Sequence, residues 1–271
     1  MSSTVRPYDL IATDLDGTLL RSDHTVSERT QRALAAATAA GAVHIVVTGR
    51  SAAWTRPTLD AIGYTGLAVC GQGAQVYDAG AHRQLTSVTL DRQLAQLALA
   101  KIEAETGPVF LSVSRDGLDG LILVGPGYDM PGDGEQMAGI TDPAEFWAEP
   151  ITRLFIQHPT LTDDELAHAA RSVAGQLVDV VMAGPGFVEV LPLGLSKATG
   201  LALAASRLGV TRERTLAFGD MPNDVPMFRW AAHGVAMANA HPSLVEAADE
   251  VTLSNDADGV AVVLELLFPQ L

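Results

Sequence analysis

The sequence predicts an α/β protein with a Rossmann-like parallel sheet core and an inserted α+β cap. Near both ends of the chain, short apolar, β-branched runs alternate with segments of helical spacing. This alternation favours a parallel sheet with helices on both faces. In the middle, strand-like runs dominate and only two helices are expected, which is typical of a unit built from paired strands. The core is therefore expected at 1–81 and 191–271, and the cap at 82–190.

The N-terminal part of the core shows three strand-like runs separated by two helical segments. "YDLIAT" and "AVHIVVT" are apolar and β-branched, and the segment between them is rich in alanine. Thr25 and Glu28 have the spacing of a capping box, and Gly41 is expected to end the first helix. The expected strands and helices, in order, are 8–13, 26–40, 42–48, 51–62 and 67–70.

The C-terminal part repeats this alternation, whereas the expected cap does not. The core elements expected there are helix 197–208, strand 215–219, helix 224–231, strand 234–237 and helix 257–267. The cap is expected to contain strands 109–114, 120–125, 152–158, 177–184 and 187–192, with helices 91–105 and 162–174. The turn-rich segment 125–139 predicts a mobile loop.

Composition and charge limit the possible partners. The chain has 271 residues, 48% of them hydrophobic, and a formal net charge of −15 with a pI near 4.7. Such a chain lacks the basic field that attracts nucleic acid or an anionic membrane. We expect a cytoplasmic protein with neither nucleic acid nor membrane as a partner, and the sequence leaves its oligomeric state open. The single cysteine, Cys70, excludes an internal disulfide.

Four segments carry the residue types of a metal-assisted phosphate chemistry, and each follows a predicted strand or opens a predicted helix. In "DLDGT", Asp14 and Asp16 lie two residues apart, so in an extended segment both carboxylates could face one site. A divalent cation would offset their repulsion. In "VVTGR", Thr48 offers a hydroxyl and Gly49 lets an anion approach the backbone.

The other two segments lie near the C-terminus. Lys197 is one of only two lysines and falls in the first turn of a predicted helix, where a positive charge opposes the helix dipole unless an anion lies nearby. Asp220 follows a predicted strand, and Asn223 and Asp224 open the next helix. Side chains with oxygen atoms at such a junction suit Mg²⁺.

Together these residues predict one reaction, on a small phosphorylated substrate. Asp14 would attack phosphorus to form an aspartyl-phosphate, with Mg²⁺ held by Asp14, the Asp16 carbonyl and Asp220. Asp16 would protonate the leaving oxygen and later take a proton from water. The phosphoryl oxygens would be held by Thr48, by Lys197 and by the backbone amides near Leu15 and Gly49.

The four segments, in this order, resemble the haloacid dehalogenase-like superfamily, and within it the Cof-type phosphatases. "DLDGTLL", "VTGR", "LSKATGL" and "GDMPNDVPM" are similar to its four motifs. The resemblance implies that Asp14 is the nucleophile and Asp16 the acid and base. It also implies a metal site formed by Asp14, Asp16 and Asp220, with Asp224 orienting metal-bound water or Lys197, and phosphate contacts from Thr48, Gly49, Lys197 and Asn223. Gln72, in "CGQGA", departs from the asparagine usual in such proteins.

Several alternatives compete with a hydrolase. A phosphotransferase or sugar-phosphate mutase on the same core would need a second anion site, made from the arginines of the expected cap: Arg83, Arg92, Arg115, Arg153 and Arg171. A signalling receiver would need neither a cap nor Asp16, and a catalytically inactive binding module would not need all of these residues. A true dehalogenase would have no task for Asp16, because a halide leaves without a proton.

Overall fold

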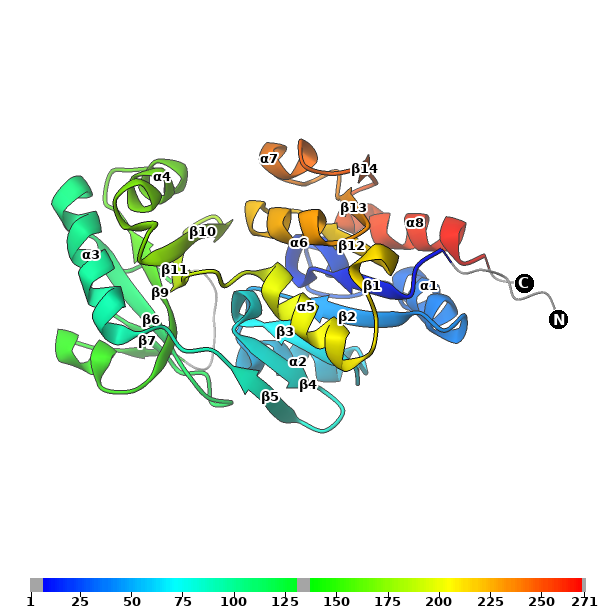
Figure 1. Ribbon diagram of the computed structural model, residues 1–271, viewed down its shortest axis with the longest axis horizontal. Helices are drawn as coiled ribbons and strands as arrows, with labels where there is room; N and C mark the ends of the chain where they lie inside the picture. Colours follow the sequence, from blue (N-terminus) through cyan, green and yellow to red (C-terminus); the bar gives the residue numbers. More distant parts are fainter. Residues whose placement is uncertain (1–6, 131–136, 270–271) are drawn as a thin grey trace.

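The computed structural model describes residues 7–130 and 137–269, which form two lobes (Figure 1). The larger lobe contains an eight-stranded sheet in the order β14-β13-β12-β1-β2-β3-β4-β5. The smaller lobe contains a six-stranded sheet in the order β10-β11-β9-β6-β7-β8. We call these lobes the core and the cap. The predicted α/β class with a parallel core sheet and a second sheet is confirmed.

Six neighbouring strands of the core sheet, from β14 to β3, run parallel, and β4 and β5 extend the sheet in antiparallel fashion. The strands are β1 (Leu10–Thr13), β2 (Val43–Val47), β3 (Leu67–Cys70), β4 (Gln75–Asp78), β5 (Arg83–Ser87), β12 (Thr215–Gly219), β13 (His233–Ala236) and β14 (Glu250–Val251).

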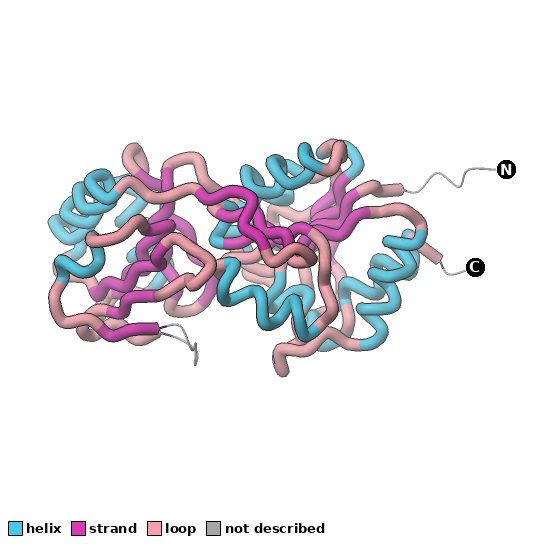
Figure 2. Tube along the Cα trace, turned by 90° about the horizontal axis from the view of Figure 1, so that it is seen from below, coloured by secondary structure: helices cyan, strands magenta, loops and turns pink. Residues whose placement is uncertain are grey.

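Helices cover both faces of the core sheet (Figures 1 and 2). One apolar cluster joins α1 and α8 to the strands, and another lies beneath α2 on the same side. The opposite face packs against α5, α6 and α7. Their bounds are α1 (Glu28–Ala39), α2 (Ala52–Ala61), α5 (Lys197–Arg207), α6 (Val225–Trp230), α7 (Pro242–Val245) and α8 (Gly259–Leu267). Burial on both faces explains why the central strands are almost wholly apolar.

The cap has two layers. Helices α3 (Arg92–Thr106) and α4 (Asp163–Ala174) pack on one face of its sheet through a single apolar cluster. The other face is turned toward the core. The cap strands are β6 (Phe110–Arg115), β7 (Ile122–Val124), β8 (Met137–Gly139), β9 (Ile151–Gln157), β10 (Val178–Gly184) and β11 (Phe187–Pro192). All neighbouring pairs are antiparallel except β7 and β8.

Two local expectations need correction or qualification. The first helix is capped by Ser27, whose hydroxyl accepts a hydrogen bond from the Thr30 amide at 3.0 Å, so the predicted Thr25–Glu28 capping box is wrong. Thr25 is instead bound to Asp23, at 2.6 Å through its hydroxyl. Of the loop predicted at 125–139, residues 131–136 lie outside the described residues, and Met137–Gly139 form β8.

The strand pairings also locate the ends of each sheet. β5 pairs with β4 in the core sheet, beyond the boundary expected at residue 82. β11 continues to Pro192 in the cap sheet, past the boundary expected at residue 190. The chain therefore passes between the lobes in the segments that follow Ser87 and Pro192. Within the described ranges, none of the helices has the length and apolar character needed to cross a membrane.

Candidate functional site

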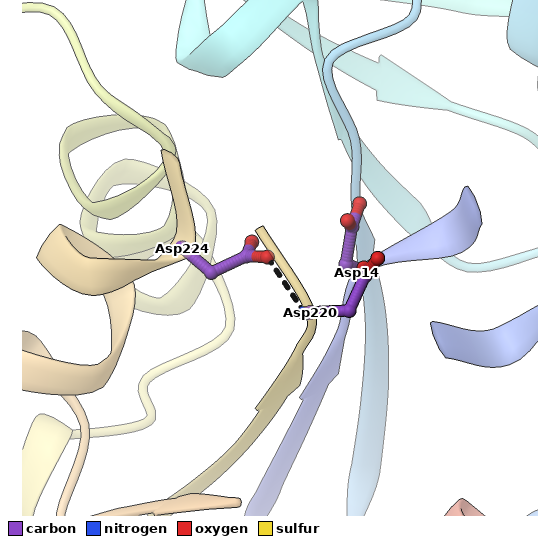
Figure 3. Close-up of side chains that lie close together, drawn as sticks. All are labelled: Asp14, Asp220 and Asp224. Carbon is purple, nitrogen blue, oxygen red and sulfur yellow. Dashed lines mark hydrogen bonds between the residues drawn. The ribbon is translucent and has the colours of Figure 1, made fainter. Parts of the chain in front are cut away.

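The carboxyl ends of the parallel strands bring the predicted site residues together. β1 lies between β12 and β2 in the sheet, so Asp14, Asp220 and Thr48 follow three adjacent strands. The Asp14 amide continues the pairing by donating to the Phe218 carbonyl at 3.0 Å. In open α/β sheets this edge is where ligands bind. Figure 3 shows Asp14 and Asp220 at neighbouring strand ends, with Asp224 reaching in from the turn before α6.

Asp14 is 5% exposed and lies where β1 ends and a tight turn, Leu15–Leu19, begins. Its Oδ1 accepts a hydrogen bond from the Leu15 amide at 2.7 Å and lies 2.9 Å from Lys197 Nζ. Both contacts engage the same oxygen, so the carboxylate is held in one orientation. Because the Leu15 amide is bound to Asp14, its predicted contact with phosphate would require that hydrogen bond to be shared or exchanged.

Lys197 lies at the start of α5 and is 1% exposed, with its Nζ next to Asp14 and Asp224. Its Nζ donates to Asp224 Oδ1 at 2.7 Å and also contacts Asp14. A buried ammonium is tolerated only when it is paired, and here two carboxylates pair with it. These anions raise the pKa of Lys197 against the opposing effect of burial, so the side chain is charged at neutral pH. This is the nearby negative charge that its position in the sequence required.

Asp224 connects several parts of the site. While Oδ1 binds Lys197, Oδ2 accepts hydrogen bonds from the backbone amides of Asp220 and Met221, each at 3.1 Å. The Asp220 side chain in turn accepts a hydrogen bond from the Thr18 hydroxyl at 2.9 Å. Asp224 therefore fixes the turn that presents Asp220, and Thr18 orients the Asp220 carboxylate toward β1.

Oxygen atoms of Asp14, Asp220 and Asp224 lie within 4.8 Å of one another. Three carboxylates against the one ammonium of Lys197 leave an excess of two negative charges in a buried place. Burial raises the pKa of Asp14 well above its usual value, and Asp224 and Asp220 add to this effect while Lys197 opposes it. Burial and Asp224 likewise raise the pKa of Asp220 to about 7. The cluster therefore favours binding either a proton or a cation.

Hard oxygen donors with unmet negative charge are what Mg²⁺ requires, so the cluster could hold a divalent metal. Asp14 and Asp220, from the ends of β1 and β12, are the predicted ligands that the structure brings together. Asp224 contributes a third oxygen to the same cluster. The Asp16 carbonyl, the other predicted ligand, belongs to the turn that starts at Asp14.

The Asp16 carboxylate does not share the position of Asp14. It forms a two-pronged contact with Arg50, whose Nε donates to Oδ2 at 2.7 Å and whose Nη2 contacts Oδ1. The Asp16 carboxylate is therefore not one of the three that lie within 4.8 Å of one another, because the chain turns after Asp14 instead of continuing as a strand. Arg50 follows Thr48 and Gly49 in the "VTGR" segment, and no local pattern indicates its contact with Asp16.

Thr48 and Gly49 lie in the loop after β2, and both contact parts of the site. Thr48 is 1% exposed, and its hydroxyl accepts a hydrogen bond from the Arg50 amide at 3.1 Å. A Cβ on Gly49 would lie 2.6 Å from Gln72 Nε2, so the Gln72 side chain passes directly over this glycine. Asn223 Nδ2 donates to Gln72 Oε1 at 3.0 Å. This hydrogen bond joins the turn after β12 to the turn after β3.

Two residues of the cap, Arg153 and Glu189, reach this site. Arg153 on β9 contacts the Gly49 carbonyl through Nη1, and the same nitrogen lies 3.1 Å from Glu189 Oε2 on β11. From the sequence, Arg153 is only one of five arginines of the expected cap, and Glu189 is not distinguished at all. No local pattern marks the pair, because the two residues are 36 positions apart and meet only through the pairing of β9 with β11.

Comparison with known proteins supports this arrangement. Residues 11–264 match the family described as haloacid dehalogenase-like hydrolases. The chain is 30% identical over 275 residues to the Bacillus subtilis 5-amino-6-(5-phospho-D-ribitylamino)uracil phosphatase YitU, covering 97% of this chain and 98% of that protein. It is 26% identical over 252 residues to YcsE, which is also a 5-amino-6-(5-phospho-D-ribitylamino)uracil phosphatase of B. subtilis. That match covers 93% of this chain and 92% of YcsE.

A solved structure of a haloacid dehalogenase-like hydrolase from B. subtilis superposes with a TM-score of 0.80. The two proteins are 25% identical, and the match covers 95% of this chain and 99% of the other. The match therefore spans the cap as well as the core. By its sequence, its fold and the grouping of its acidic residues, the chain belongs to the haloacid dehalogenase-like hydrolases.

Proposed function

We propose that the protein is a Mg²⁺-dependent phosphohydrolase of small phosphorylated metabolites that acts through an aspartyl-phosphate on Asp14. The observation that carries this proposal is the buried group of Asp14, Asp220 and Asp224 around Lys197 at adjacent strand ends. The names of YitU and YcsE support the same class of reaction, since both are phosphatases of a phosphorylated polyol attached to a base.

Asp14 is suited to act as the nucleophile because its Oδ1 is held by Lys197 and the Leu15 amide. Oδ2 is then the oxygen directed to attack phosphorus. Mg²⁺, held by Asp14, Asp220, Asp224 and the Asp16 carbonyl, would supply charge neutralisation between the carboxylate and the phosphate. Thr48, Asn223 and the Gly49 backbone lie at the neighbouring strand ends, where they can hold the phosphoryl oxygens as charge shifts toward the leaving group.

Asp16 is the proposed proton donor to the leaving oxygen and the base that activates water afterwards. Both of its carboxylate oxygens are engaged by Arg50 in this structure. Proton transfer therefore requires at least one of these oxygens to leave Arg50. Arg50 is a positioning residue in this scheme because it acts through Asp16 and not on the phosphate.

Asp16→Asn is expected to separate the two halves of the reaction. With an alkyl phosphate, the rate should fall by roughly 10²- to 10⁴-fold because the poor leaving group needs its proton. With p-nitrophenyl phosphate, whose leaving group departs without a proton, we expect a burst of about one p-nitrophenol per enzyme, followed by a stall when no base activates water. Rapid-mixing absorbance measurements would record the burst. An equal loss on both substrates without a burst would contradict the role of Asp16.

Removal of the metal is expected to stop phosphate release, and the need for Mg²⁺ should depend on pH. Because the pKa of Asp220 is raised to about 7, Mg²⁺ must displace a proton from it at lower pH. Below about pH 7, the apparent Kd for Mg²⁺ should therefore rise about tenfold per pH unit. Phosphate release can be titrated with Mg²⁺ after EDTA treatment at several pH values. Activity that persists in EDTA would end the proposal.

The raised pKa of Asp220 also predicts how the stability of the metal-free protein depends on pH. The folded, metal-free protein holds a proton at Asp220 that the unfolded chain has lost between about pH 4 and pH 7. The stability of the metal-free protein should therefore fall as pH rises through this window. Mg²⁺ should restore it, and the increase in Tm caused by Mg²⁺ should be larger at about pH 7.5 than at about pH 5.5.

A phosphotransferase needs a second anion site, and three of the five arginines that could form it are already engaged by other groups of the protein. Arg153 is the cap arginine that reaches the core loop at Gly49, and its charge is already paired with Glu189. Arg92 and Arg171 donate to backbone carbonyls within the cap, those of Trp147 and Val180. Phosphate release without any added acceptor would distinguish a hydrolase from a transferase.

A further inference from the structure

Two asparagines from the C-terminal part of the core bind the turn that carries Asp16. Asn239, in the loop after β13, donates through Nδ2 to the Gly17 carbonyl at 2.8 Å. Asn255 Nδ2 donates to the Leu20 carbonyl at 2.9 Å. The two asparagines are also joined to each other, because the Asn255 amide donates to Asn239 Oδ1 at 3.1 Å. Together they hold the turn in its middle and directly after its end.

The segment that carries Asn255 is itself firmly placed. The Ser254 carbonyl accepts a hydrogen bond from the Gly259 amide at 3.0 Å, and a Cβ on Gly259 would lie 2.1 Å from the Leu253 carbonyl oxygen. Asp258 has a φ of 58°, a left-handed conformation that side chains rarely adopt. The helix that begins here, α8, packs in one apolar cluster with α1 and the core strands. The segment can therefore serve as a fixed support for the turn.

Two further contacts continue this support beyond the turn. Ser22 donates to Asp256 through its amide at 2.9 Å and through its hydroxyl at 2.7 Å. Arg21 Nη2 donates to Asp258 Oδ1 at 2.7 Å. Both pairs are more exposed than the contact made by Asn255, so competition from water weakens them. The asparagine contacts are therefore expected to hold the turn more strongly than these two pairs.

The position of Asp14 does not depend on these asparagines. Its amide is paired with the Phe218 carbonyl at the end of the sheet, and its carboxylate lies 2.9 Å from Lys197 Nζ. The Asp16 side chain, in contrast, is 47% exposed and contacts Arg50. Loss of the asparagine contacts should therefore displace Asp16 while leaving Asp14 in place.

The proposed reaction makes a specific demand on this turn. Asp16 must release Arg50 before it can transfer a proton, and at that moment the backbone of the turn has to keep the carboxyl group near the leaving oxygen. Small displacements of a catalytic group lower the rate strongly.

We propose that Asn239 and Asn255 are positioning residues for Asp16, which hold the turn in place while the carboxyl group exchanges Arg50 for the substrate. This inference rests on the proposed phosphohydrolase function, and it adds two residues that act through the acid and base.

Asn239→Ala is the first test, because this side chain is exposed and its removal should leave the protein folded. With glycerol 2-phosphate, whose leaving group needs a proton, kcat should fall about tenfold with little change in KM. With p-nitrophenyl phosphate, the rate of the first turnover should stay within about twofold of the wild type, because that leaving group needs no proton. Gln96→Ala removes an exposed amide on α3 of the cap and is the matched control, with both rates unchanged.

Asn255→Ala should show the same difference between the two substrates. It also leaves the Leu20 carbonyl without its donor in a buried place, so thermal unfolding should show a less stable protein. A purely structural loss lowers the rates on both substrates by the same factor, because only the folded fraction reacts. The difference between the two substrates therefore separates positioning from stability.

A double-mutant cycle with Asp16→Asn tests whether the asparagine acts through Asp16. In that background, Asn239→Ala should lower the hydrolysis of glycerol 2-phosphate by less than about twofold, because the group that it positions is already absent. A further tenfold loss there would overturn the inference. So would an equal loss on both substrates in Asn239→Ala alone, or an unchanged kcat on glycerol 2-phosphate.

The two proposals fail in different ways. If the wild-type protein releases phosphate from both esters in the presence of Mg²⁺ but Asn239→Ala behaves like Gln96→Ala, only the positioning role is wrong. If the wild type releases no phosphate from either ester, both the function and the role that depends on it are wrong.

Discussion

Asp14→Asn is expected to reduce phosphate release by roughly four orders of magnitude or more, because the variant cannot form the covalent intermediate. The side chain is buried at the end of β1, and its orientation is set by Lys197 and the Leu15 amide. An asparagine keeps the size of the side chain but replaces the attacking oxygen or its charge. Binding of substrate could survive this change, whereas turnover should not.

Three measurements would establish this result. Steady-state release of inorganic phosphate gives the loss of rate. Hydroxylamine, which displaces phosphate from an aspartyl-phosphate, should leave a hydroxamate on wild-type Asp14 and none in the variant. Removing one of three clustered carboxylates lowers their mutual repulsion, so thermal unfolding should show a folded protein. Asp60→Asn, an exposed change on α2, is the control and should retain full activity. Substantial turnover by Asp14→Asn would exclude Asp14 as nucleophile.

Lys197→Met is expected to damage both stability and catalysis. Removing the ammonium leaves the Asp14 and Asp224 carboxylates buried without their cation. Breaking a buried ion pair from one side typically costs about 3–5 kcal/mol of unfolding free energy. The loss of a positive donor at the site should lower kcat by roughly 10²- to 10³-fold in whatever fraction remains folded.

The pH dependence of this loss has a definite direction. The pKa of Lys197 is raised, so its stabilising contribution is fully present below the ordinary lysine pKa of 10.5 and would be lost only at higher pH. In the variant, the carboxylates can take up protons as pH falls, which relieves their repulsion. The stability gap to the wild type should therefore be largest near pH 7 and shrink toward about pH 5.

Denaturant unfolding at several pH values, with and without Mg²⁺, would measure this gap. Mg²⁺ should recover part of the stability of Lys197→Met because it returns positive charge to the same carboxylates. Lys101→Met changes the chain's other lysine, which is exposed on α3, and should behave as the wild type. If Lys197→Met were as stable as the wild type near pH 7, the contacts of Lys197 with Asp14 and Asp224 would not stabilise the protein.

The parallel core and the position of its acidic edge could be predicted because they depend on local patterns. Apolar β-branched runs predicted β1, β2 and β12, and the polar residues directly after them predicted the site. The sequence does not predict β4 and β5, because polar side chains, Gln75 and Arg83 among them, interrupt their apolar residues. Their strand state is decided by pairing with β3 and with each other, which no local propensity reports.

What the sequence by itself determined is therefore the class of fold, the edge of the sheet that carries chemistry and the residues Asp14, Lys197 and Asp220 that would perform it. Only the tertiary structure decided the partners of the charges. It paired Asp16 with Arg50, Lys197 with Asp224, and Arg153 with Glu189. The physical reason is range: hydrophobic periodicity and turn chemistry act over a few residues, whereas an ion pair forms where strand register and lobe packing bring distant side chains together.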